Sequence, residues 1–150
     1  MLKDIQVIRR GQGREVFING VKALRVNGGN SPTGGHSGMC KTVYFGDEFV
    51  VKFDDMSEAQ MFIEEEDRPH FAEVVYADIN REWYVQRRVN CVPNAEIFEE
   101  DTLIAEELAW KYGFGDVGDM DGERYGVDYR IGHNFTLDLN GRVVIYDYSG

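Results

Sequence analysis

Apolar runs separated by turn residues divide the chain into short strands with few helical segments. Near the start, residues 5–8 and 15–26 carry the β-branched and aromatic residues that strands favour, and Asn19-Gly20 interrupts the second run. An Asn-Gly pair between two such runs is the strongest short-range signal of a β-hairpin, because both turn positions favour positive φ. The opening segment therefore predicts a strand and a hairpin that extend or cap a sheet, with Glu15 and Lys22 facing solvent.

The middle of the chain predicts a buried strand followed by a helix. Residues 49–53, Phe-Val-Val-Lys-Phe, form an apolar run that contains one charge, Lys52. A lysine on a buried strand requires a partner, because an unpaired buried charge is very costly. Ser57 is a suitable N-cap for a helix over residues 58–65, whose apolar residues recur at helical spacing. Glu58 is the candidate partner of Lys52.

Further elements follow from the same patterns. Residues 69–76 and 82–89 predict two strands separated by a turn around Asn80. Residues 99–112 predict an amphipathic helix that ends at Gly113. The apolar residues of this helix are Leu103, Ile104, Leu108 and Trp110.

The last part of the chain predicts a second hairpin with polar residues at its mouth. Asn140-Gly141 separates two apolar runs, and Asn134 and Asp147 lie at the outer ends of those runs. A hairpin brings its ends together, so the amide oxygen and the carboxylate are expected side by side. Hard divalent cations favour such oxygen ligands, which makes Asn134 and Asp147 candidate metal ligands.

The segment between the opening strands and Lys52 is the most glycine-rich part of the chain. Glycine allows the backbone to approach a phosphate closely and to present its N–H groups to an anion. Gly35 and Gly38 are the candidate phosphate-binding positions. The segment is not a Walker loop, because no Gly-Lys-Ser/Thr closes it. Such a segment is also common as a flexible connection.

The order of these features resembles that of the protein-kinase superfamily. Residues 49–53 resemble the kinase Val-Ala-Ile-Lys strand, and Gly35-x-x-Gly38 followed by Val43 resembles half of the kinase glycine-rich loop. Asn134 and Asp147 resemble the magnesium-binding Asn of the catalytic loop and the Asp of Asp-Phe-Gly. The likeness covers residues 34–150, is most specific in residues 134–150, and is closest to small kinase-like proteins of bacteriophages.

The resemblance implies a fold and a set of roles. It implies an α+β fold in one domain, with an N-terminal lobe of antiparallel sheet plus one helix over residues 1–89 and a reduced C-terminal lobe over residues 90–150. ATP and Mg²⁺ are the implied cofactors, with Lys52 on the phosphates and paired with Glu58, and with Asn134 and Asp147 on the metal. Met61 and Phe62 would dock the helix. Gln86 to Arg88 would begin the hinge whose backbone pairs with adenine.

Two departures from the kinase pattern bear on catalysis. Tyr129 stands where the catalytic Asp is expected, five residues before Asn134, and Asp128 lies one residue further back. Asp128 could serve as the base only if the loop carries an extra residue. The sequence given ends three residues after Asp147, without the activation loop and helical platform that hold a peptide substrate. The resemblance therefore implies a weak phosphotransferase or a pseudokinase.

The charge balance favours an alternative function of a different class. The chain of 150 residues has 27 acidic and 16 basic residues and a formal charge of −11. This acidity argues against direct binding of nucleic acid, which requires clustered Lys and Arg. An acidic, non-catalytic phage inhibitor could instead dock onto a basic host or defence protein, for example as a nucleic-acid mimic, through residues 64–67, 96–101 and 116–123. The plain alternative is that the charge only maintains solubility.

Other features of the composition narrow the setting. Cys40 and Cys91 are expected as free thiols in a bacterial host cytoplasm, because no secretion signal is evident. Three histidines and two isolated cysteines provide no zinc spacing. The acidic loop from Asp116 to Gly122 lacks the ligand alternation of a calcium loop. No apolar run approaches the length that crosses a bilayer.

Overall fold

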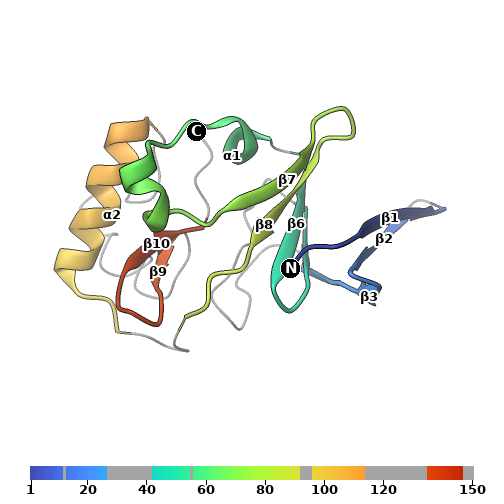
Figure 1. The fold of residues 1–150 in the computed structure, drawn as a ribbon, viewed down its shortest axis with the longest axis horizontal. Coiled ribbons are helices and arrows are strands. Elements are labelled where there is room, and N and C mark those ends of the chain that lie inside the picture. Colours follow the sequence, from blue (N-terminus) through green and yellow to red (C-terminus); the bar gives the residue numbers. More distant parts are fainter. Residues whose placement is uncertain (12, 27–41, 55, 92–95, 114–134, 147–150) are drawn as a thin grey trace.

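The fold is α+β, with antiparallel sheets and few helices, as the sequence predicts (Figure 1). The computed structural model describes residues 1–11, 13–26, 42–54, 56–91, 96–113 and 135–146. In these ranges the strands form a three-stranded sheet at one end of the long axis, a five-stranded sheet in the middle, and a two-stranded hairpin beside helix α2 at the other end.

The five-stranded sheet provides the frame of the molecule. Its strands are β4 (Leu24–Val26), β5 (Thr42–Phe45), β6 (Phe49–Phe53), β7 (Val74–Asp78) and β8 (Trp83–Arg87). The order is β4-β5-β6-β8-β7, and all neighbours are antiparallel. All five residues of β6 are buried, because the strand lies between β5 and β8 and is covered on both faces. Residues 49–53 form a nearly continuous apolar run because the strand occupies this central position.

The N-terminal sheet covers one face of the central sheet. It consists of β1 (Ile5–Arg10), β2 (Gly13–Ile18) and β3 (Val21–Lys22). Val16 and Ile18 share a core with Phe53 and Trp83 of the central sheet. The predicted hairpin is confirmed: Asn19 and Gly20 have φ of 50° and 80° between β2 and β3. Lys22 is exposed as predicted, whereas Glu15 is only partly exposed and pairs with Arg10.

The second core joins the C-terminal elements. Helix α2 (Glu99–Tyr112) packs on the hairpin of β9 (Phe135–Leu137) and β10 (Val143–Ile145) (Figure 1). The helix bounds are as predicted, and Gly113 ends the helix with φ of 74°. The predicted apolar side is wrong except for Leu108, which is buried with Ala105 and Ala109. Leu103, Ile104 and Trp110 are 50%, 41% and 57% exposed, because the helix turns its small residues towards the core.

The C-terminal hairpin is confirmed, but its turn differs from the prediction. In the turn after β9 only Gly141 has positive φ, of 78°, among the described residues. The Asp138 carboxylate accepts hydrogen bonds from the backbone N–H groups of Asn140 and Arg142, at 2.8 and 2.9 Å. The loop is therefore of the three-residue kind, in which one left-handed residue suffices.

The segment after β6 departs most from the sequence prediction. Helix α1 spans only Ser57–Gln60, and its N-cap is Met56, so the assignment of Ser57 as N-cap is wrong. The chain becomes extended at Met61, and a 3-10 helix, η1, follows over Glu65–His70. Strand β7 therefore begins at Val74 and not at residue 69.

The expectation that Phe62 docks the helix is also wrong. Met61 and Ile63 pack against the second core, whereas Phe62 between them is 74% exposed. This alternation belongs to extended chain, in which successive side chains point to opposite faces. Over a run as short as residues 58–65, the spacing of apolar residues does not distinguish a helix from an extended chain.

Cys91 is in the thiol form, whereas Cys40 lies outside the described residues. Among the described helices, none has the length and apolar character needed to span a bilayer.

Candidate functional site

The site is built around a lysine on the central strand. Lys52 lies on β6 between Val43 of β5 and Tyr84 of β8, on the face opposite to the core of the N-terminal sheet. Its side chain is fully buried. The Nζ atom donates to Glu58 Oε1 at 2.8 Å and to the backbone oxygen of Tyr146 at 2.7 Å. The ammonium therefore has both an ion-pair partner and a carbonyl acceptor.

Glu58 receives several donors at one carboxylate oxygen. Besides Lys52, the hydroxyl of Tyr84 donates to Oε1 at 2.5 Å, and Nε2 of Gln86 donates at 3.5 Å. Tyr84 and Gln86 alternate on β8, so the strand presents both to the face that carries Lys52. The pairing of Lys52 with Glu58 is observed as predicted. Because both side chains are buried, Glu58 is not part of a solvated acidic face and Lys52 is not a lysine at the edge of the sheet.

The contact with Tyr146 ties the C-terminal hairpin to the central sheet. It joins residues that are 94 positions apart in the sequence. A second tie runs alongside, since the N–H of Ala72 donates to the backbone oxygen of Ile145 at 2.8 Å. Tyr146 directly precedes Asp147 in the sequence. The Lys52 ammonium thus contacts the residue that directly precedes Asp147, the candidate metal ligand, in the sequence.

The residues of the expected hinge are engaged within the protein. Gln86 lies opposite Val50 on one side and Val74 on the other. The N–H groups of Arg87 and Arg88 donate to Glu73 and Glu48 backbone oxygens at 2.8 and 2.9 Å.

Arg88 is held by its side chain as well. Nη1 of Arg88 donates to the Gly46 oxygen at 2.7 Å, and the guanidinium lies over the Phe45 ring. Burial lowers the pKa of Arg88 from its ordinary value. The adenine contact expected at Gln86 to Arg88 would therefore have to displace existing hydrogen bonds or fall on the residues that follow.

The other candidate site residues lie outside the described part of the chain. They are Gly35, Gly38, Asp128, Asn134 and Asp147.

A groove is lined in part by Glu58. It has a volume of about 1180 Å³ and lies between α1, β7 and the turn at Asp138 to Asn140. Phe62, Tyr76 and Leu139, which are exposed, are among its lining residues, whereas Lys52 is not.

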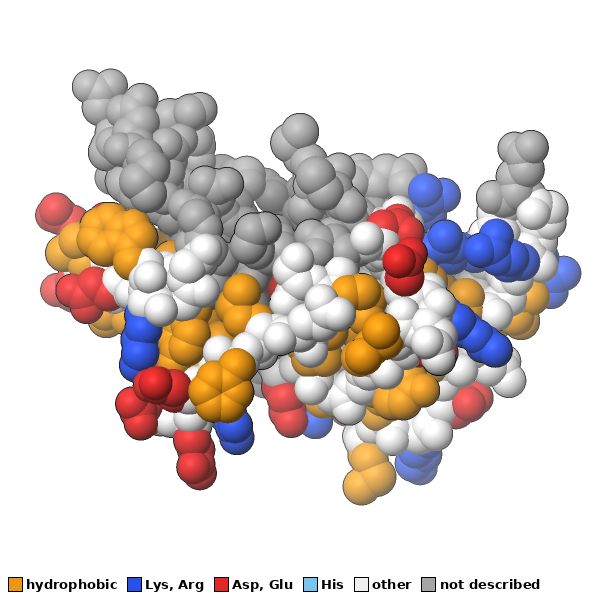
Figure 2. Space-filling model, turned by 90° about the horizontal axis from the view of Figure 1, so that it is seen from above, with side chains coloured by type: hydrophobic (Ala, Val, Ile, Leu, Met, Phe, Trp, Pro, Cys, Tyr) orange, Lys and Arg blue, Asp and Glu red, His pale blue; other side chains and the backbone are white. Residues whose placement is uncertain are grey.

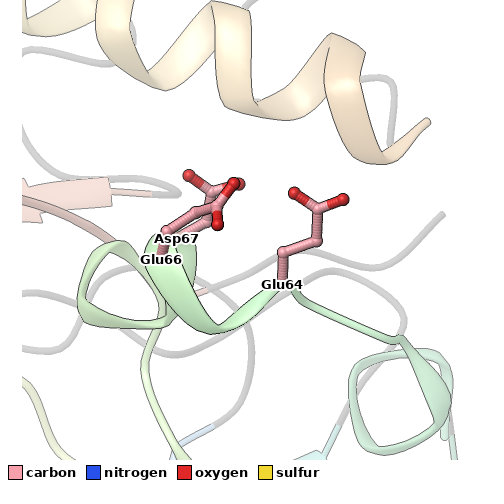
Figure 3. A group of neighbouring side chains, drawn as sticks. All are labelled: Glu64, Glu66 and Asp67. Atoms are coloured by element: carbon pink, nitrogen blue, oxygen red, sulfur yellow. The ribbon is translucent and has the colours of Figure 1, made fainter.

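A second charged cluster, which the sequence did not indicate, joins η1 to α2. Glu64, Glu66 and Asp67 extend from this segment towards α2 and could in principle hold a cation (Figure 3). The cation that they hold is the ammonium of Lys111, which lies 2.8 Å from Glu64, 3.9 Å from Glu66 and 2.7 Å from Asp67. The Tyr112 hydroxyl also donates to Asp67. This cluster is a clamp between two elements, and a metal ion would have to displace Lys111.

The contacts within the clamp shift the titration of its members. Hydrogen bonds from Lys111 and then Tyr112 lower the pKa of Asp67 below 3.8, and the hydrogen bond from Lys111 lowers the pKa of Glu64 below 4.5. The hydrogen bonds to Asp67 and Glu64 raise the pKa of Lys111 above 10.5. Burial, and then the hydrogen bond to Asp67, raise the pKa of Tyr112. Lowered acid pKa values stabilise the fold above the unfolded values, and a raised lysine pKa stabilises it below the unfolded value. The clamp thus contributes fully between about pH 4.5 and 10.5.

Replacing Lys111 by methionine will lower the melting temperature at pH 7 by a few degrees. The difference from wild type will shrink as the pH falls below 4.5, because Glu64 and Asp67 become protonated in both proteins. Thermal unfolding followed by circular dichroism from pH 7 to pH 2.5 measures this. The control is Lys22→Met on exposed β3, whose difference from wild type should not change with pH. A Lys111→Met difference that is constant over this range would contradict the clamp.

No family model matches this chain, and no match was found among curated proteins or among solved structures.

Proposed function

We propose that this protein is a small, phage-type kinase-like protein that binds ATP and Mg²⁺ beside Lys52, with weak or absent phosphotransferase activity. The observation that carries the proposal is the buried ion pair between Lys52 and Glu58. In protein kinases, the lysine of the third strand must pair with the glutamate of the following helix. Here Lys52 lies on the third strand of the five-stranded sheet, in chain order, and Glu58 lies on the helix that follows.

The order of the remaining elements supports the same proposal. After Glu58 come β7 and β8, the fourth and fifth strands of the sheet, and then α2 and the C-terminal hairpin. The hydrogen bond from Lys52 to the Tyr146 oxygen joins strand β6 of the central sheet to the end of the C-terminal hairpin. A kinase-like cleft requires such an approach, because its lysine and its metal ligands act on the same nucleotide phosphates.

Nucleotide binding would require one hydrogen bond of Lys52 to be exchanged. The ammonium is buried, and one of its acceptors is the neutral carbonyl of Tyr146. A phosphate oxygen is the stronger acceptor, because the hydrogen bond is then between two charged groups. Glu58 would keep the ammonium in place during the exchange. Gly35 and Gly38 would cover the phosphates, and Val89 and Asn90 would offer the adenine contact in place of the engaged residues before them.

The metal would be held by Asn134 and Asp147. Mg²⁺ supplies charge neutralisation at the phosphates of the nucleotide. Asp128 is the candidate base for any remaining phosphoryl transfer. Because this chemistry depends mainly on positioning and on charge stabilisation, a displaced base lowers the rate without preventing nucleotide binding.

ATP with Mg²⁺ is expected to raise the thermal stability of the wild-type protein. At a concentration of about one hundred times Kd the gain is about 2.7 kcal/mol, or about 5–10 °C for a domain of this size. The shift should be absent in the double variant Lys52→Met with Glu58→Gln, which removes both charges and leaves an acceptor for Tyr84. It should persist in Lys22→Met, where the same change is made on an exposed strand. Differential scanning fluorimetry with ATP, with Mg²⁺ alone and with both gives the comparison.

Two outcomes of this titration would overturn the proposal. One is the absence of a shift in the wild type, and the other is an equal shift in the double variant. The absence of a shift would favour the alternative of an acidic docking protein. That alternative has its described support in residues 96–101, of which Glu96, Glu99 and Glu100 are exposed at the start of α2. The acidic stretch at 64–67 supports it less, because Lys111 already neutralises part of its charge.

A further inference from the structure

The charges of this acidic chain are unevenly distributed. Residues 1–26 hold six of the 16 basic residues and two of the 27 acidic ones, so this segment carries +4 and the rest carries −15. These residues form the N-terminal sheet and β4. Figure 2 shows Lys and Arg side chains gathered at the end that carries this sheet, whereas Asp and Glu side chains crowd the end that carries α2 and η1. The N-terminal segment is thus positively charged although the whole chain is negatively charged.

The basic side chains of this sheet have few anionic partners. Elsewhere Lys52, Lys111, Arg81 and Arg87 each pair with a carboxylate, whereas Arg68, Arg88 and Arg142 have no carboxylate partner among the described residues. On the N-terminal sheet and β4, Arg10 pairs with Glu15 at 2.9 Å. Within the described residues, no carboxylate pairs with the remaining cations of this segment, which are Lys3, Arg9, Arg14, Lys22 and Arg25. In a chain with so many acids, the absence of such pairs makes these cations available to an external anion.

Three of these arginines are linked to one another by strand pairing and by contacts with aromatic rings. Arg9 and Arg14 are directly opposite one another on β1 and β2. The Arg14 guanidinium lies 4.0 Å from the centre of the Phe53 ring, and its Nη1 atom is buried without a hydrogen-bond partner among the described residues. Phe53 contacts Tyr44, which lies opposite Arg25 on β4. We call Arg9, Arg14 and Arg25 the arginine site.

This arrangement costs stability unless an anion is present. Like charges directly opposite on antiparallel strands repel one another. A buried donor without an acceptor also loses the hydrogen bonds that it made with water. A phosphate group would relieve the repulsion, because its oxygens can accept from two guanidinium groups at once and Arg is well suited to such contacts.

We propose that the arginine site binds the phosphodiester backbone of a nucleic acid. The cations recur along strands β1, β2 and β4, which favours a ligand whose anionic groups recur at short intervals. Each phosphate contact releases bound counterions, so the affinity for such a ligand increases with the number of contacts. Lys3 and Lys22, also unpaired within the described residues, add to the attraction. This inference does not depend on the proposed nucleotide site.

The acidic body does not prevent this binding. The N-terminal sheet and α2 lie at opposite ends of the long axis (Figure 1). A domain of this length has a radius of gyration of about 15 Å, and the screening length at physiological salt is about 8 Å. Repulsion from the far end is therefore largely screened at the arginine site. Close to the acidic end the repulsion is not screened. The ligand is therefore restricted to the basic end of the protein, which favours a short contact.

Fluorescence anisotropy with labelled single-stranded and duplex oligonucleotides tests the proposal. With three phosphate contacts, the slope of log K against log salt should be about −2 for single strands and about −2.7 for duplex. Affinity should then fall about 16- to 40-fold between 50 and 200 mM salt. The double variant Arg9→Glu with Arg25→Glu should bind at least tenfold more weakly. Arg14→Lys, which keeps the charge and loses the planar fork, should bind a few-fold more weakly.

The controls separate this site from the rest of the protein. Arg142→Glu makes the same charge change at an exposed position of the C-terminal turn and should bind as wild type does. The double variant Lys52→Met with Glu58→Gln should bind oligonucleotides as wild type does, so failure here is distinguishable from failure of the nucleotide proposal. Undetectable binding at 50 mM salt, or an equal loss in Arg142→Glu, would overturn the inference. Equally tight competition by poly-glutamate would do so too, because the ligand would then be an acidic polypeptide.

Discussion

Replacing Lys52 by methionine will lower the free energy of unfolding by about 3–5 kcal/mol. The variant leaves the Glu58 carboxylate buried without its ion-pair partner. Small domains are stable by only about 5–15 kcal/mol, so this loss is a large part of the total. Urea denaturation followed by far-UV circular dichroism measures it.

The double variant Lys52→Met with Glu58→Gln separates charge from packing. It removes both charges, and the amide oxygen that replaces the carboxylate remains as an acceptor for Tyr84 and Gln86. Replacing both members of a buried ion pair is often close to neutral, so most of the lost stability should return. Lys22→Met on the exposed strand β3 should lie within about 0.5 kcal/mol of wild type. A loss below about 1 kcal/mol in the single variant would show that the pair is not held in the buried geometry described here.

Replacing Phe135 by alanine will cost about 3–5 kcal/mol, because it leaves a cavity in the second core. Phe135 is fully buried on β9, in the core that α2 and the C-terminal hairpin share. The matched control is Phe62→Ala, since Phe62 is 74% exposed and should change stability by no more than about 0.5 kcal/mol. Denaturant midpoints of the two variants give the comparison. Equal losses would mean that Phe62 docks a helix after all, as its position in the sequence led us to expect.

Short-range signals in the sequence predicted much of the fold. Asn19-Gly20 and Asn140-Gly141 predicted both hairpins, and Gly113 marked the end of α2. These signals are reliable because each acts within a few residues through backbone conformation. The turn at Gly141 also shows their limit. The side chain of Asp138 selects a three-residue loop there, and the dipeptide alone does not reveal this choice.

The candidate site was predictable only where one strong physical requirement applied. Lys52 on an apolar strand required a partner, and Glu58 was the nearest acid on a following helix. The roles of Tyr84 and Gln86 were missed, because β-strand alternation does not show which face meets α1. The clamp at Lys111 was missed because it joins residues 44 positions apart, and nothing local marks either side. The arginine site was missed because the net charge was taken over the whole chain, whereas the basic residues are concentrated in residues 1–26.

The contact between Lys52 and the Tyr146 oxygen has a consequence for synthesis in the cell. The two residues are 94 positions apart, so at about 5–20 residues per second the ribosome adds Tyr146 about 5–20 seconds after Lys52. During that interval the Tyr146 carbonyl, which later accepts a hydrogen bond from the ammonium, is not yet present. The Lys52 ammonium can therefore gain its second acceptor only after translation has passed β10.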